Sequence, residues 1–432
     1  MQPFTLLESE VRGYCRAWPV VFESAHGWTL VDERGRSYLD FFAGAGALNY
    51  GHNHPVLIDA LIDHLRAGGL IHGLDMATTT KRTFLERFDE LVLRPRGLNY
   101  KLQFPGPTGT NAVEAALKLA RRVTGRENVV SFTNAFHGMT LGSLAITGNT
   151  SKREGAGVPL TNRDVFPFAG FLGDDADTIG YLEAFLADGT GVDTPAAVIV
   201  ETVQGEGGIN VASDTWLRRL DALCKEHGIL LVIDDIQVGC GRTGPFFSWE
   251  RAGIDPDIVT LSKSLSGSGL PFALLLLKPE HDVWEPGQHN GTFRGNNAAF
   301  ATATAALELF WSDEGLQGEV DRKASIVADG LEGLRKRHDG IYEERRGKGL
   351  IQGLSTTVPE AAGAIARAAF ERGLLIETAG PSDEVVKLLP PLIVDDAAID
   401  RATVILDQAT EAVIDRLGED LLAGDDEDEV AK

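Results

Sequence analysis

The feature that most constrains the fold is a series of short, continuously apolar segments that alternate with amphipathic helical segments from about residue 56 onward. Apolar residues recur at helical spacing through 55–67, 78–92, 110–123 and 214–227. Uninterrupted apolar stretches of strand length occur at 128–132, 196–201, 228–233, 257–261 and 271–277. Strands that are apolar on both faces and alternate with helices indicate a mostly parallel sheet with helices on both sides, so we predict an α/β fold.

The two ends of the chain have a different pattern. Residues 20–40 alternate short apolar runs with turn signals and predict a small antiparallel hairpin or meander. Residues 296–338 predict long helices, and the C-terminal part has α+β character with a last amphipathic helix near 397–417. We therefore expect a large α/β domain (61–318) and a smaller domain built from an N-terminal segment (1–60) and a C-terminal part (319–432). The acidic run from about 424 predicts a solvated, disordered tail.

Composition excludes several classes of protein. The 40 Lys and Arg residues against 63 Asp and Glu residues give a net charge of −23, so neither nucleic acid nor an anionic membrane surface is an expected partner. Cys15, Cys224 and Cys240 are far apart and favour a reducing cytoplasm over a disulfide framework. The acidic N-terminus does not have the pattern of a signal peptide, and no apolar run is long enough to span a bilayer.

The first candidate for chemistry is a loop of small and hydroxyl residues, Thr108-Gly109-Thr110-Asn111, at the start of a predicted helix. The free N–H groups and the positive end of a helix dipole at such a position bind anions such as phosphate. An ordinary helix cap formed by Thr110 or Asn111 is the alternative interpretation.

The second and third candidates follow apolar strands. Asp234 ends the apolar run at 229–233, and Lys263 directly follows the run at 258–261. The carboxyl ends of parallel strands are where open α/β sheets bind ligands. There a carboxylate can pair with a protonated pyridine nitrogen, and a lysine beside an apolar strand end can lose its proton and attack a carbonyl carbon. Taken singly, Asp234 is equally compatible with a solvated loop acid, and a lone lysine is far more often a solvated surface group.

The order of the three features resembles the class III (ornithine/GABA-type) aminotransferases, which depend on pyridoxal 5′-phosphate (PLP). The resemblance runs from about residue 20 to the C-terminal helix. It implies the PLP-dependent transferase fold of the aspartate aminotransferase type (fold type I). It also implies that Lys263 carries PLP as a Schiff base, that Asp234 contacts the pyridine nitrogen, and that the cofactor phosphate lies against Thr108, Gly109 and Thr110.

Further positions match the family one by one. The resemblance of Phe136-His137-Gly138 to an aromatic-His-Gly segment implies that Phe136 packs on the ring face, and Gln237 matches a residue beside the ring hydroxyl. Thr292 resembles a threonine that reaches the phosphate of the neighbouring subunit, which implies a homodimer or higher homo-oligomer with shared active sites. Glu201 and Glu206 match two glutamates near the substrate.

The family commonly pairs glutamate and 2-oxoglutarate with a terminal amine and its aldehyde. In many relatives an arginine binds the glutamate carboxylate and otherwise pairs with a glutamate, which Glu206 matches. This chain departs from that pattern because Lys387 occupies the arginine position, and a lysine does not offer the two-pronged contact of a guanidinium. Arg294 is a second candidate for this contact. His52 and His54 lie in a turn without a third ligand, so we expect no metal site.

Three segments, 41–51, 103–110 and 289–296, resemble the branch of the family that serves ectoine synthesis. The resemblance implies conversion of L-aspartate 4-semialdehyde and L-glutamate to L-2,4-diaminobutyrate and 2-oxoglutarate in two half-reactions. The acidic composition is compatible with a bacterium under salt stress. The alternatives are another ω-aminotransferase acting on ornithine, acetylornithine or GABA, a PLP aminomutase or racemase, and a non-enzymatic protein in which Lys263 is incidental.

Overall fold

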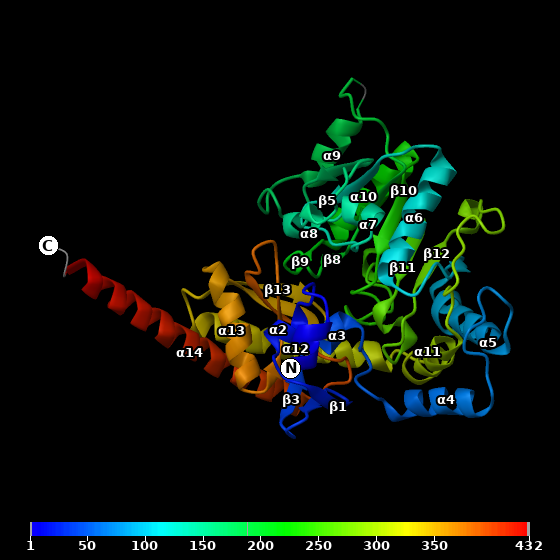
Figure 1. Ribbon diagram of the computed structural model, residues 1–432. Coiled ribbons are helices and arrows are strands. Elements are labelled where there is room, and N and C mark those ends of the chain that lie inside the picture. Colours follow the sequence, from blue (N-terminus) through cyan, green and yellow to red (C-terminus); the bar gives the residue numbers. More distant parts are fainter. Residues whose placement is uncertain (1, 188, 430–432) are drawn as a thin grey trace.

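The computed structural model describes residues 2–187 and 189–429, and a seven-stranded sheet forms its centre (Figure 1). The strand order is β4-β12-β11-β10-β7-β5-β6, and only β12 runs antiparallel to its neighbours. The strands are β4 (Lys101–Gln103), β5 (Val129–Phe132), β6 (Arg163–Phe166), β7 (Ala197–Val200), β10 (Leu230–Asp234), β11 (Ile258–Leu261) and β12 (Leu274–Leu277). The predicted mostly parallel α/β sheet is confirmed.

Alternate side chains of the central strands enter two separate cores, which is why these strands are apolar throughout. In β10, Leu231 and Ile233 pack with residues of α10 (Asp214–His227) and α5 (Thr79–Phe88). Leu230 and Val232 pack on the opposite face with α6 (Gly109–Thr124). Successive side chains of a strand point to opposite faces of the sheet, and here both faces are apolar. Helices therefore cover both faces of the sheet. Further helices of this region are α4 (Pro55–Arg66), α7 (Leu141–Ala145), α8 (Thr150–Glu154), α9 (Thr178–Leu186) and α11 (Asn297–Phe310).

The N-terminal strands and the C-terminal part share another core. The strands β1 (Phe22–His26), β2 (Thr29–Asp32) and β3 (Ser37–Asp40) form the predicted antiparallel meander, and β3 pairs in parallel with β15 (Leu374–Leu375). Leu39 and Phe41 pack with the C-terminal helices. In Figure 1 the blue N-terminal strands lie beside α12 (Gly315–Arg337) and α13 (Pro359–Glu371). The proposed domain boundaries near 60 and 318 remain predictions.

A second antiparallel sheet, in the order β13-β14-β17-β16, lies in the C-terminal part. Its strands are β13 (Tyr342–Lys348), β14 (Ile351–Thr356), β16 (Glu377–Ala379) and β17 (Val385–Leu388). The short hairpin of β8 (Val203–Gln204) and β9 (Asn210–Val211) joins β7 to α10. Near the N-terminus, α1 (Gln2–Leu7), α2 (Tyr14–Ala17) and α3 (Ala43–Gly46) are short.

The sequence did not predict the two edge strands of the large sheet or the full length of the last helix. The strands β4 and β6 lie at the sheet edges and carry charged residues, so they do not show the apolar run of the central strands. The last helix, α14, extends over Asp396–Glu429, so the expectation of a disordered tail is wrong for 424–429. Residues 424–429 are Gly, Asp and Glu, and only Glu among them has high helix propensity, so propensity does not explain this extension. No helix within the described ranges is long and apolar enough to cross a membrane.

Candidate active site

Most of the predicted site residues converge at the carboxyl ends of the parallel strands. Asp234 is the last residue of β10, Lys263 lies in a 3₁₀ turn that follows β11, and Phe136 lies in the loop after β5. A single cavity at this edge is lined by Gly109, Thr110, Phe136, His137, Glu201, Glu206, Asp234, Gln237 and Lys263 among others. This is the position at which open α/β sheets bind their ligands.

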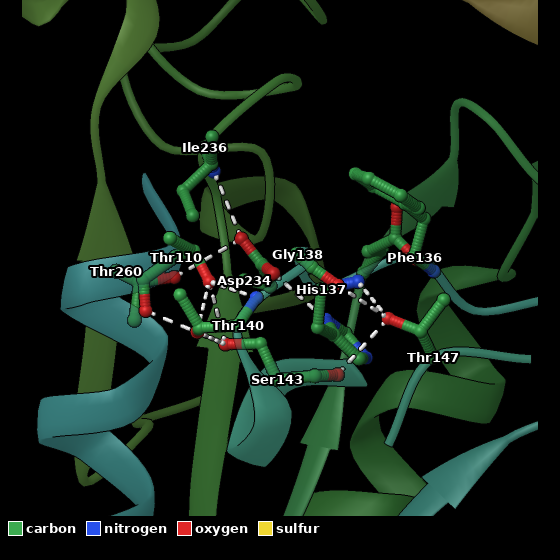
Figure 2. A network of polar contacts seen from close by, with 11 residues as sticks. Thr110, Phe136, His137, Gly138, Thr140, Ser143, Thr147, Asp234, Ile236 and Thr260 are labelled. Carbon is green, nitrogen blue, oxygen red and sulfur yellow. Dashed lines mark hydrogen bonds and ion pairs between the residues drawn. The ribbon is translucent and has the colours of Figure 1, made fainter. Parts of the chain in front are cut away.

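Asp234 is held by a network that fixes both of its carboxylate oxygens (Figure 2). The Asp234 Oδ2 atom lies 2.7 Å from His137 Nδ1, and Oδ1 accepts from the Thr260 hydroxyl at 3.0 Å and the Ile236 N–H at 3.2 Å. Burial acts to lower the pKa of His137, but the bond to Asp234 outweighs it and the pKa is raised. The other ring nitrogen, Nε2, is buried without a partner within the described ranges. The carboxylate therefore has a fixed position.

Lys263 has an unusual backbone conformation and an amine with a lowered pKa. Its φ of 46° lies in the left-handed region, which non-glycine residues adopt chiefly where the surroundings enforce it. The amine donates to the Ala45 carbonyl at 2.9 Å. Burial lowers the pKa of Lys263, and the nearby Glu206 opposes that effect only in part. The amine is thus more readily available in its nucleophilic, unprotonated form.

The first turn of α6 forms another wall of the cavity. Thr108 is the N-cap of this helix, and its N–H donates to Asn111 Oδ1 at 3.2 Å, so Asn111 takes part in an ordinary helix cap as the alternative interpretation expected. The Thr110 hydroxyl lies 2.6 Å from the Thr140 hydroxyl. An added Cβ at Gly138 would lie 2.5 Å from the Thr110 hydroxyl oxygen, so no residue larger than glycine fits at position 138 without a shift. A close-fitting, hydroxyl-rich helix N-terminus is suited to hold a phosphate group.

Two more hydroxyl-bearing residues contact Thr110 without lining the cavity, and the sequence did not single them out. Ser143 lies 2.9 Å from the Thr110 hydroxyl, and Thr140 also donates to Glu114 Oε1 at 2.5 Å. Thr140 is the N-cap of α7 and Ser143 lies within α7, which follows the Phe136-His137-Gly138 loop and packs against α6 (Figure 2). Only the fold brings this loop and the helix together, since 30 residues separate the two threonines.

A cluster of charges lies on the side of the cavity that faces the C-terminal sheet. Lys387 of β17 is fully buried and pairs with Glu206 at 2.8 Å and with Glu377 at 3.0 Å. Gln237 donates to the same Glu206 oxygen at 3.0 Å, and Tyr14 donates to Glu377 at 3.5 Å. The sequence did not predict a role for Glu377. It is the direct cross-strand partner of Lys387, and this register is not visible in a single sequence.

The three charges of the cluster shift one another's pKa. Burial acts to lower the pKa of Lys387, but Glu206 and Glu377 outweigh burial and raise it. Burial acts to raise the pKa of Glu206, but Lys387 and Lys263 outweigh it, and the pKa is held well below its usual range. Burial raises the pKa of Glu377 despite its contact with Lys387. Lys387 is therefore cationic, and Glu206 is its principal counter-charge.

Glu201 lies deeper in the same cavity. Burial raises the pKa of Glu201 to about 7, with His137 opposing and Asp234 adding to the shift. Its carboxylate accepts from the Phe136 N–H at 3.0 Å and so helps to place the loop that carries the aromatic ring.

Four predicted substrate or cofactor contacts do not line this cavity in the single chain: Thr108, Lys387, Thr292 and Arg294. Thr108 caps α6, and Lys387 pairs with the wall residue Glu206. Thr292 is exposed, and its carbonyl lies 2.8 Å from His72 Nε2. Arg294 donates to Asn290 Oδ1 at 3.2 Å, with Asp75 at 3.9 Å. Neither lines the cavity around Lys263. His52 pairs with Asp40 at 2.7 Å, and the described part of the chain contains no group of three or more possible metal ligands.

Comparison with known proteins agrees with this geometry. The sequence pattern of the family described as aminotransferase class-III matches residues 13–410. The chain belongs to the class III aminotransferases. The cofactor of this family is PLP, and the solved structure of a relative, ornithine aminotransferase from Toxoplasma gondii, is described with PLP at its active site. The resemblance and the fold type predicted from the sequence are confirmed.

Individual relatives cover nearly all of the aminotransferase. A protein of Nocardia farcinica named diaminobutyrate–2-oxoglutarate transaminase is 59% identical over 411 residues, 95% of this chain and 94% of the relative. A protein of the same name from Bordetella parapertussis is 57% identical over 419 residues, 96% of each chain. The crystal structure of ornithine aminotransferase from T. gondii superposes with a TM-score of 0.84 at 27% identity, over 96% of this chain and 95% of that chain.

Proposed function

We propose that this aminotransferase converts L-aspartate 4-semialdehyde and L-glutamate to L-2,4-diaminobutyrate and 2-oxoglutarate. The observation that carries the substrate assignment is that relatives named diaminobutyrate–2-oxoglutarate transaminase are 57% to 59% identical over nearly the whole chain. A place at the start of ectoine synthesis, in the cytoplasm, is part of the same proposal. The acidic composition supports it, because a strongly negative surface keeps a protein soluble.

The residues of the cavity fit the cofactor. A lysine with a lowered pKa, a buried carboxylate and a hydroxyl-rich helix N-terminus are the groups that would hold an aldehyde, a pyridine nitrogen and a phosphate, respectively. We assign these contacts to Lys263, to Asp234, and to Thr108, Gly109 and Thr110. Phe136 would pack on the ring, and His137 would hold Asp234 in place. Gln237 lines the same cavity and would lie beside the ring hydroxyl.

When bound, PLP supplies an electron sink that makes the carbon bearing the amino group acidic. The Lys263 amine, once free, would take the proton from that carbon and deliver it to C4′ of the cofactor, as general base and then general acid. Asp234 stabilises the charge drawn toward it, because its two oxygens are fixed by His137 and Thr260. The same residues serve the second half-reaction in reverse.

Glu206 and Lys387 would let one site accept two kinds of substrate. Glutamate brings a carboxylate that Lys387 can bind if Glu206 moves aside, and other substrates leave the 2.8 Å pair intact. Glu201 is a further wall residue near the substrate. Arg294 would contribute only if a neighbouring subunit supplies it, since it lies outside the cavity of its own chain.

The same reasoning supports a homodimer with shared sites. Thr292 is exposed in the single chain, and we assign it to the cofactor phosphate of the neighbouring subunit. Replacing Thr292 with alanine should weaken cofactor binding about tenfold, the loss of one hydrogen bond to a charged group, in equilibrium dialysis. A monomer at micromolar concentration in sedimentation equilibrium would contradict the assignment.

The deciding experiment separates the two half-reactions. The enzyme is loaded with glutamate, freed of excess substrate, and offered aspartate, glutamate or succinate semialdehyde in separate reactions. Aspartate semialdehyde should restore the original cofactor absorbance fastest. If glutamate or succinate semialdehyde is faster, the enzyme acts on ornithine, acetylornithine or GABA instead. If glutamate alone releases no 2-oxoglutarate, an aminomutase or racemase replaces the aminotransferase assignment.

A further inference from the structure

A second cavity adjoins the one that contains Lys263 and shares two of its wall residues, Phe136 and Glu206. Its other walls include Asn149, Lys152, Glu154 and Pro381. A substrate whose reacting carbon lies at Lys263 therefore has room to extend past Phe136. The chemistry of these walls decides which distal groups can occupy the space.

The walls of this second cavity carry one cation. The Lys152 ammonium lies 4.5 Å from the centre of the Phe136 ring, and its backbone N–H is fixed by Asn149 Oδ1 at 3.1 Å. No carboxylate within the described ranges pairs with Lys152, whereas Lys387 already has two carboxylate partners. An unpaired ammonium positioned by an aromatic ring is available to bind a carboxylate.

Glu206 supplies a negative charge to the same space. Both of its hydrogen bonds, from Gln237 at 3.0 Å and from Lys387 at 2.8 Å, end on Oε1. The other oxygen, Oε2, has no hydrogen-bond partner among the described residues, and the side chain retains 22% of its exposure. Glu154 also lines the cavity but is exposed to solvent. The partly buried charges are therefore one ammonium and one free carboxylate oxygen.

We propose that Lys152 and Glu206 together bind the distal end of the amino-aldehyde substrate, Lys152 its carboxylate and Glu206 its ammonium. This proposal rests on the proposed function. Diaminobutyrate and aspartate 4-semialdehyde both react at C4 and carry an ammonium on C2 and a carboxylate at C1. A cation and an anion on the walls of one cavity match the two charges of this zwitterion, and burying either substrate charge is costly unless it meets a group of opposite charge.

Two simpler amines separate the two contacts. 4-Aminobutyrate has the same reacting amine and carboxylate as diaminobutyrate but no C2 ammonium. 1,3-Diaminopropane has the ammonium but no carboxylate. We would measure kcat/KM for the three amines in the first half-reaction alone, on enzyme loaded with PLP, so that binding of 2-oxoglutarate does not enter the result.

Lys152→Met should lower kcat/KM about 10- to 100-fold for diaminobutyrate and 4-aminobutyrate, and leave 1,3-diaminopropane within about twofold. Lys152→Arg should retain most of the wild-type preference because it retains the cation. Glu206→Gln should give the complementary pattern: it should lower kcat/KM for diaminobutyrate and 1,3-diaminopropane but not for 4-aminobutyrate. Lys225→Met removes an exposed lysine of α10 and should change none of the three values.

Binding without reaction at C4 provides a second readout. Homoserine has the same zwitterionic end and a hydroxyl in place of the reacting amine. Its dissociation constant, measured by calorimetry with the PLP-loaded enzyme, should rise about 10- to 100-fold in Lys152→Met and remain unchanged in Lys225→Met.

Equal losses for all three amines in Lys152→Met would overturn the proposal, because they would show a general disturbance of the site. An unchanged preference in both the Lys152 and Glu206 variants would overturn it as well, and if the wild type still favours diaminobutyrate the proposed function would stand. A wild-type enzyme that does not react with diaminobutyrate would overturn both the proposed function and this assignment.

Discussion

The two sides of the cavity are built in different ways. Asp234 and Lys263 lie at the ends of adjacent parallel strands. The neighbours that fix Asp234 are Thr260 of β11 and His137 in the loop after β5. The cluster of Glu206, Glu377 and Lys387 instead joins the loop after β8 to two strands of the C-terminal sheet. The first side holds groups in one fixed place, as catalysis needs. The second side consists of charges that can exchange partners, as a site for two substrates needs.

The largest effect should come from the fixed side. Lys263→Ala removes the amine that we assign to proton transfer, and the single-turnover rate with glutamate should fall by at least about 10³-fold. Rapid-mixing absorbance measurements with enzyme reconstituted with PLP would give this rate. Lys225→Ala, on the surface of α10, is the control. A loss of less than tenfold in Lys263→Ala would remove the distinction between the two sides.

The charge cluster should matter for stability as well as for substrate. Lys387→Met leaves Glu206 and Glu377 buried without their cation, which should lower the free energy of unfolding by about 3–5 kcal/mol at pH 8. The loss should shrink as the pH falls and the carboxylates take up protons. Urea unfolding of the PLP-loaded enzyme at pH 8 and pH 5.5 would measure both.

Restoring neutrality should reverse most of that loss. Adding Glu206→Gln and Glu377→Gln to Lys387→Met removes the uncompensated charges without changing the size of the side chains. A triple variant as unstable as Lys387→Met would show that packing, and not charge, dominates the cluster.

The smallest effect belongs to Glu201, at the boundary of the two sides. Burial raises the pKa of Glu201 to about 7, so the folded protein binds an extra proton between the ordinary pKa of a glutamate, about 4.3, and 7. Wild-type stability therefore loses a contribution as the pH rises through this window. Glu201→Gln keeps an acceptor for the Phe136 N–H. Relative to wild type, its free energy of unfolding should increase by about 2–3 kcal/mol as the pH rises from 4.5 to 7.5. Urea unfolding across this pH range would measure both proteins. A difference in their free energies of unfolding that does not change with pH would contradict the raised pKa of Glu201.

How much of each side of the cavity could be predicted from the sequence depends on which elements carry its residues. Asp234 and Lys263 each end an apolar strand, and parallel strands place their ends at one edge, so a one-dimensional pattern predicts their proximity. The site roles of Phe136, Gln237 and Glu206 came from family resemblance, and the fold brings all three to the cavity. Their functional roles remain predictions.

Contacts that depend on the register of distant strands could not be predicted. Glu377 faces Lys387 across β16 and β17, and Tyr14 reaches the same cluster from the N-terminus. Lys152 gains its significance only because α8 folds back over Phe136. The edge strands β4 and β6 were missed for a related reason, since an edge strand needs no apolar pattern.

Covalent trapping shows which lysine of the enzyme carries the cofactor, and we assign that role to Lys263. The PLP-loaded enzyme is reduced with borohydride, digested, and analysed by peptide mass spectrometry. We expect one pyridoxyl group per chain, attached to Lys263, and none in Lys263→Ala. A pyridoxyl group on another lysine, or an unmodified Lys263 in the reduced wild-type enzyme, would show that Lys263 does not carry the cofactor.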